Sequence, residues 1–66
     1  MKPMLYATPK GFAEVTGYGD GYKVEYDSKT IPTEILKDDG DFASWVFKNR
    51  AHFMGNYRKG EKLAAK

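Results

Sequence analysis

Residues 15–26 read VTGYGDGYKVEY, and their three glycines lie on alternate positions between two apolar segments. Asp20-Gly21 is a strong signal for a two-residue hairpin turn, because both central positions of a type I′ turn need positive φ. Pairing about this turn sets Val15 opposite Tyr26 on one face, and it sets Tyr18 with Lys23 on the other. One face is then apolar and the other largely polar, as a half-buried antiparallel sheet requires. A register shift of two residues would leave both faces unchanged.

The same glycines do not match a nucleotide-binding loop. A dinucleotide fingerprint needs Gly-x-Gly-x-x-Gly at the start of a helix, where the pyrophosphate binds. Here the spacing is Gly-x-Gly-x-Gly, Tyr22 stands where the third glycine would be, and residues 23–27 alternate like a strand. No Gly-Lys-Ser/Thr sequence follows. The stretch therefore predicts a hairpin, and no cofactor is expected.

Turn signals on either side extend the sheet. Residues 8–11, TPKG, suit a β-turn with proline second and glycine fourth, which joins a strand at 4–7 to a strand at 12–18. Pro32 excludes a central strand, so 27–36 is expected to hold a turn, a brief edge strand at 29–31 and one helical turn from Pro32.

The C-terminal part predicts an amphipathic helix. Asp41 is its expected N-cap, and the helix runs from residue 42 to about 54 with Gly55 as the stop, or to 57–58 with Gly60 as the stop. Its apolar stripe centres on Phe42, Val46, Phe53 and Tyr57, and is widened by Ala43, Phe47 and Met54. Trp45 borders the stripe, so Trp45 and Tyr57 are expected to be spare aromatics. The predicted fold is α+β, a meander of three or four antiparallel strands with this helix packed on one face.

Size and composition set further limits. Sixty-six residues predict one domain, expected at 1–58, with a flexible basic tail at 59–66. The chain has no cysteine and no apolar run long enough for a signal peptide or membrane span, so a soluble cytoplasmic protein is expected. Residues 1–41 carry five Lys or Arg against eight Asp or Glu, a net charge of −3, and residues 42–66 carry six against one, or +5. The asymmetry indicates an electrostatic partner, a solvated helix end, or two halves that face each other.

Candidate catalytic and metal sites are weak. Ser44, Lys48 and His52 have i, i+4 and i+8 spacing, but nothing supplies an oxyanion hole or an orienting carboxylate. The aspartates at 38, 39 and 41 do not follow the EF-hand pattern, and a lone histidine without cysteine cannot hold zinc. We therefore expect no enzyme activity and no metal.

The aromatic and basic side chains favour a binding module. The preferred partner is a larger protein, bound through exposed aromatics and an open strand edge, as for an adaptor, an inhibitor or a phage-type regulator. The alternative is a nucleic acid bound by a basic, aromatic helix. The protein is expected to be a monomer or a weak homodimer, and no membrane is expected among its partners. The predicted contact residues are Tyr18 and Lys23 on the sheet, and Trp45, Lys48, His52, Tyr57, Arg58 and Lys59 on the helix.

Overall fold

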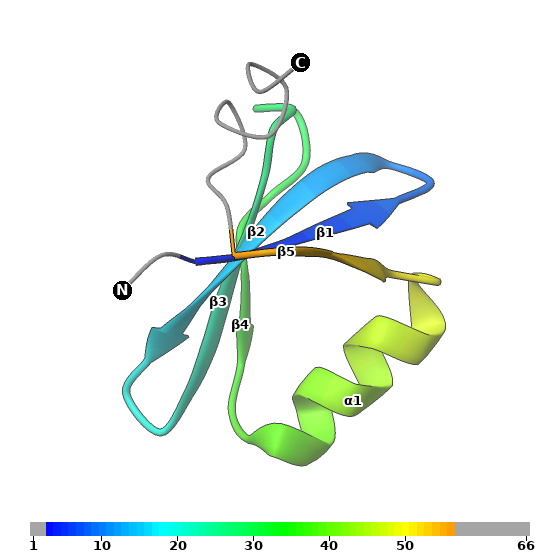
Figure 1. Ribbon diagram of the computed structural model, residues 1–66. Coiled ribbons are helices and arrows are strands. Elements are labelled where there is room, and N and C mark those ends of the chain that lie inside the picture. The colour runs from blue at the N-terminus through cyan, green and yellow to red at the C-terminus, as the bar shows by residue number, and fades with distance from the viewer. Residues whose placement is uncertain (1–2, 57–66) are drawn as a thin grey trace.

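An antiparallel sheet and one helix make up the fold, as the α+β prediction requires (Figure 1). The computed structural model describes residues 3–56. The elements are β1 (Met4–Thr8), β2 (Gly11–Tyr18), β3 (Gly21–Tyr26), β4 (Glu34–Leu36), α1 (Asp39–Lys48) and β5 (His52–Gly55). Within the described residues no helix has the length and apolar character needed to cross a membrane. The predicted tail at 59–66 lies outside this range.

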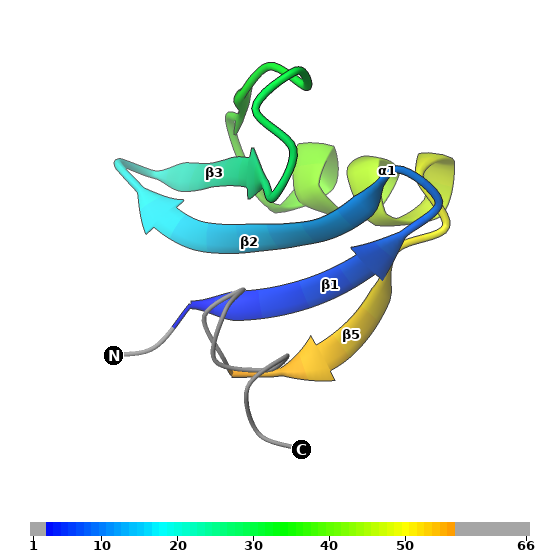
Figure 2. The same ribbon diagram turned by 90° about the horizontal axis from the view of Figure 1, so that it is seen from above.

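The sheet has five strands in the order β4-β3-β2-β1-β5, so β4 and β5 form its two edges. Figure 2 shows β3, β2, β1 and β5 side by side. The helix lies on one side of the sheet and leads from the end of β4 to the start of β5 (Figure 1). The predicted three or four strands were therefore too few, and the helix is followed by a strand instead of ending the fold.

The central hairpin is confirmed, with its turn moved by one residue. Val15 pairs with Val24 and Tyr18 pairs with Gly21, so Gly19 and Asp20 form the turn. Gly19 has φ +60°, and Asp20 is not among the residues with positive φ. Glycine at the first central position with positive φ is the arrangement of a type II′ turn, whereas type I′ needs positive φ at both. The register differs from the prediction by two residues, and the two faces keep their predicted composition.

The first turn is confirmed as well. Thr8 pairs with Gly11, which leaves Pro9 and Lys10 as the turn residues. The Thr8 hydroxyl donates a hydrogen bond to the Gly11 carbonyl at 2.8 Å and accepts one from the Lys10 amide at 3.1 Å. Proline at the second turn position and these two bonds hold β1 and β2 in register.

The segment between β3 and β4 departs from the prediction. No strand forms at 29–31 and no helical turn begins at Pro32; the chain turns over 27–31, and β4 then pairs Glu34 with Val24 and Leu36 with Tyr22. Proline lacks an amide donor, so the strand starts beyond it. Ile31 packs against the core from this loop. The apolar residue that was assigned to a strand therefore anchors a loop.

The helix begins at Asp39, three residues before the predicted start at residue 42. Asp38, not Asp41, is the N-cap: its Oδ1 accepts from the Asp41 amide at 2.8 Å. Asp39 and Asp41 then lie in the first turn, where carboxylates interact favourably with the positive end of the helix dipole. Three closely spaced aspartates made the correct cap ambiguous from sequence alone.

The helix ends at Lys48, well before either predicted stop. The Ala51 amide donates to the Val46 carbonyl at 2.9 Å, and the Arg50 amide donates to the Phe47 carbonyl at 3.3 Å. This pair of bonds is the Schellman motif, and it places Arg50 in the left-handed region with φ 50°. Glycine usually takes this position, but here the residue is arginine. The sequence therefore has no glycine that marks the true end of the helix, and the predicted ends at Gly55 and Gly60 were too late. The chain freed beyond Ala51 pairs with β1 as β5.

The core lies between the helix and one face of the sheet. Its buried members are Tyr6, Ala13, Val15, Val24, Tyr26, Leu36 and Trp45. Trp45 is only 3% exposed, so the prediction that it is a spare aromatic at the border of the stripe is wrong. Phe47, predicted to widen the buried stripe, is 88% exposed. The stripe was miscentred because Phe53 and Met54 were assigned to the helix when they belong to β5.

Candidate functional site

The face of the sheet opposite the helix carries exposed apolar side chains. Alternation along the strands directs Thr16, Tyr18, Lys23 and Ile35 to this face, and we call these four residues the bare-face patch. Thr16 pairs with Lys23, and Lys23 pairs with Ile35, so the patch runs across β2, β3 and β4. Tyr18 is 56% exposed and Ile35 is 53% exposed. Exposed apolar side chains grouped in this way mark an interaction surface more often than isolated ones do.

Tyr18 and Lys23 form a unit within the patch. The Lys23 ammonium lies 5.7 Å from the centroid of the Tyr18 ring, which is within the range of a cation–π contact. Lys23 itself is partly buried. The pair therefore presents an aromatic ring and a positive charge together, in a geometry that is already ordered.

Acidic residues lie next to the patch on the same face. Glu14 and Glu25 face each other across β2 and β3. Lys23 is the one cation among the four residues of the patch.

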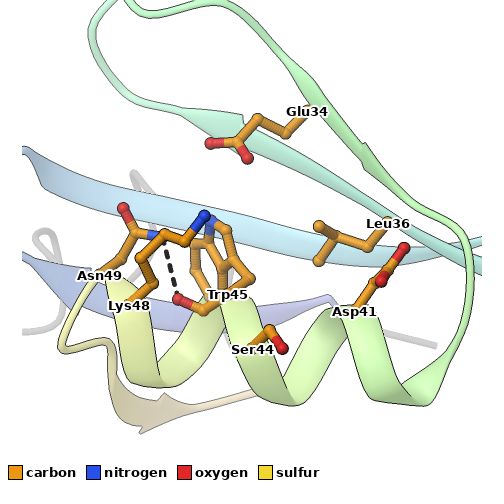
Figure 3. A pocket seen from close by; sticks show the side chains of 7 residues that line it. All are labelled: Glu34, Leu36, Asp41, Ser44, Trp45, Lys48 and Asn49. Atoms are coloured by element: carbon orange, nitrogen blue, oxygen red, sulfur yellow. Dashed lines mark hydrogen bonds between the residues drawn. The ribbon is translucent and has the colours of Figure 1, made fainter.

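A small cleft opens between β4 and the helix, on the other side of the sheet (Figure 3). It measures about 190 Å³, and Leu36 and Trp45 form its apolar floor. Glu34 lies on the strand side, and Asp41, Ser44, Lys48 and Asn49 line the helix side. Binding pockets for drug-sized ligands typically span roughly 300–1,000 Å³, so this cleft has room for one side chain.

A short hydrogen-bond chain joins the helix to the strand behind this cleft. The Trp45 indole donates to the Tyr26 hydroxyl at 3.2 Å, and that hydroxyl donates to the Glu34 carboxylate at 3.4 Å. Burial raises the pKa of Tyr26, the indole bond opposes this, and the Glu34 charge adds to the rise. The bond from Tyr26 holds the Glu34 carboxylate at the rim of the cleft. The Asn49 amide, in turn, donates to the Trp45 carbonyl at 2.9 Å and closes the far end.

A second hollow of about 490 Å³ lies beside the loop that follows β3, lined by residues including Tyr26, Ile31 and Pro32. In this loop the Ser28 and Thr30 hydroxyls bond each other at 2.8 Å, and the Thr30 amide donates to Ser28. These bonds order the loop itself. The charged residues Glu25, Asp27 and Lys29 also line the hollow.

The structure separates the predicted contact residues into several places. Tyr18 and Lys23 lie together in the bare-face patch, Lys48 lines the cleft, and Trp45 is part of the core. His52 is exposed on β5, at the opposite edge of the sheet from β4, so the helical spacing with Ser44 and Lys48 does not exist. The predicted contacts Tyr57, Arg58 and Lys59 lie outside the described residues.

Three exposed apolar residues were missed by sequence reasoning: Ile35, Phe47 and Phe53, which was predicted in the buried stripe and is 49% exposed. Ile35 was placed in an uncertain segment, and only the pairing of β4 with β3 shows that it faces away from the core. The exposure of Phe47 depends on where the helix is centred, which local sequence does not determine. Among residues 3–56, no cluster of three histidine or acidic side chains is arranged to hold a metal ion.

Comparisons with protein-family models, with curated proteins and with solved structures found no match for this chain.

Proposed function

We propose that this protein is a non-catalytic module that binds another protein through the bare-face patch. The observation that carries the proposal is the grouping of Tyr18, Lys23 and Ile35 on the face that the helix leaves uncovered. Tyrosine is enriched among the residues that contribute most to binding at protein interfaces, and polar residues typically surround the apolar centre of such an interface. An adaptor, an inhibitor or a regulator would use such a surface.

The charge distribution supports a protein over a nucleic acid. Glu14 and Glu25 lie beside the patch, and the helix carries Asp39 and Asp41 against the single cation Lys48. A protein that binds phosphates needs several cations on one surface, because each neutralised phosphate contributes to affinity. The helix on which the alternative function was based ends at Lys48, so His52 is not part of it, and Tyr57, Arg58 and Lys59 lie outside the described residues.

A second copy of this chain is a poorer occupant of the patch than a different protein. A symmetric contact centred on the patch would bring Lys23 toward Lys23 of the other copy, and like charges oppose each other. A different protein can place a carboxylate there instead. We propose no catalytic role for the cleft, since within residues 3–56 Ser44 makes no hydrogen bond with a base that would activate it.

The test is capture of a partner from a lysate of the native host by the wild-type protein and three single variants. Tyr18→Ala and Ile35→Ser should each weaken recovery of one stoichiometric protein by roughly tenfold, as for central interface residues. Phe47→Ala is the control, because it removes an even more exposed ring from the helix side of the molecule. Circular dichroism establishes that all variants are folded.

Retention of the protein by both patch variants would overturn the proposal, and so would its loss with Phe47→Ala alone. A mobility shift with single-stranded or duplex nucleic acid that weakens steeply with salt would favour the alternative function. Recovery of a protein that binds the wild type and all three variants equally would contradict binding through the patch.

A further inference from the structure

The outer edge of β4 lies between the bare-face patch and the cleft. β4 ends the sheet, and within the described residues no strand pairs with its outer side. An unpaired edge presents backbone N–H and C=O groups that can bond a further strand. Ile35 extends to the patch, while Glu34 and Leu36 extend to the cleft. A strand added here would place alternate side chains in these two environments.

The other edge of the sheet is less suited to receive a strand. The pairing of β5 with β1 is irregular, since Leu5 pairs with Gly55 and Tyr6 pairs with Phe53, which leaves Met54 as an extra residue. Gly55 also has φ +118°. A bulge at an edge twists the backbone away from regular pairing and protects that edge. The regular register of β4 with β3 has no such interruption.

The cleft beside β4 is chemically matched to a basic side chain. Its rim carries the carboxylates of Glu34 and Asp41 against the single ammonium of Lys48, so its formal charge is negative. Its floor of Leu36 and Trp45 can pack against methylene groups. Arginine and lysine combine an apolar stem with a positive tip, and one such side chain fits a cleft of about 190 Å³.

We propose that the protein partner docks as an extended segment that adds to β4 as a sixth strand, with an arginine or lysine in the cleft and an adjacent apolar side chain on Ile35. The inference rests on the proposed function, because it describes how the partner of the same patch binds. Backbone hydrogen bonds to β4 supply affinity, and the two side-chain environments on either face of the edge supply specificity.

The probe is a displayed library of short random peptides selected against the full chain. Selected peptides should share a period-two pattern in which a basic residue is next in sequence to an apolar one. Binding of a selected peptide should slow hydrogen exchange at the amides of Glu34–Leu36. Peptides with helical spacing, exchange changes confined to β5, or no selected peptide at all would each overturn the inference.

Charge variants of the cleft give effects of opposite sign. Glu34→Gln and Asp41→Asn keep the hydrogen-bond acceptors and remove one negative charge each, so each should weaken a selected peptide about two- to fivefold. Lys48→Gln removes the opposing positive charge and should strengthen the same peptide by a similar factor. Identical responses to all three variants would contradict the placement of the basic residue.

N-methylation of successive backbone amides in the selected peptide tests the strand geometry. Methylation should reduce affinity by roughly tenfold at alternate positions only, because every second amide of an added strand points toward β4. Equal tolerance at all positions would overturn strand addition. If capture from the lysate still depends on Tyr18 in that case, the proposed function stands and only its mode of binding fails.

Discussion

Arg50 is the one non-glycine residue with a left-handed backbone in the part of the chain that the structure describes. A Cβ in this region clashes with the neighbouring carbonyl, and glycine avoids that cost. We expect Arg50→Gly to raise the free energy of unfolding by about 0.5–1 kcal/mol. Arg50→Ala is the control, because alanine keeps the backbone cost while it also removes the guanidinium. Urea denaturation that shifts both variants equally would assign the effect to the side chain instead.

The raised pKa values of three tyrosines predict how the free energy of unfolding changes at alkaline pH. A hydrogen bond from its hydroxyl to Asp39 raises the pKa of Tyr22, and burial raises the pKa of Tyr6 and Tyr26. In the unfolded chain the pKa of tyrosine is about 10. Because the pKa values of these tyrosines are higher in the folded chain, their contribution to the free energy of unfolding is at its full value below about pH 10 and decreases as the pH rises further. Urea midpoints should be constant from neutral pH to about 9 and decrease above about 10.

Tyr22→Phe is the corresponding control. The substitution removes one of the three tyrosines with a raised pKa, so the urea midpoint should decrease less above about pH 10. Near neutral pH the midpoint should remain independent of pH. A wild-type protein whose stability rises above pH 10 would contradict the direction of these shifts.

At the scale of elements, Gly21 determines how closely β4 approaches β3. A Cβ built on Gly21 would lie 1.9 Å from the Leu36 carbonyl oxygen, a backbone atom that cannot rotate away. Gly21→Ala should therefore lower the free energy of unfolding by about 1–3 kcal/mol and increase hydrogen exchange in β4. Gly17→Ala is the matched control, since a Cβ there meets nothing within 4 Å, and its effect should stay within about 0.5 kcal/mol. Equal effects of the two substitutions would show that β4 is not held by this contact.

At the scale of the whole molecule, the helix connects the two edges of the sheet. Trp45, the single tryptophan, is buried between the helix and the sheet. Its ring centroid lies 5.7 Å from that of Tyr6, and its indole N–H donates a hydrogen bond to the Tyr26 hydroxyl. We expect one cooperative unfolding transition, in which tryptophan fluorescence and far-ultraviolet circular dichroism give the same urea midpoint. A fluorescence change at lower urea would indicate that the helix separates before the sheet unfolds. Trp45→Phe keeps a ring without the indole donor and should lower both midpoints together.

Part of the candidate site was accessible from sequence. Tyr18 and Lys23 were predicted on the polar face of the hairpin, and they do lie together on the bare face, because period-two alternation determines the face of each side chain regardless of register. Their role in binding stays a prediction. Ile35 could not be placed, since its exposure depends on a pairing with Lys23 that no local pattern signals.

The amino-acid sequence by itself determined the α+β class, the central hairpin and the division of its two faces. These follow from local preferences: glycine and proline in turns, and alternation along a strand. Only the tertiary structure decided that the helix ends at Lys48, that His52–Gly55 pairs with β1, and that Trp45 instead of Phe47 faces the core. The physical reason is that each of these depends on contacts between residues far apart in the chain, where packing against the sheet outweighs the helical preference of the segment.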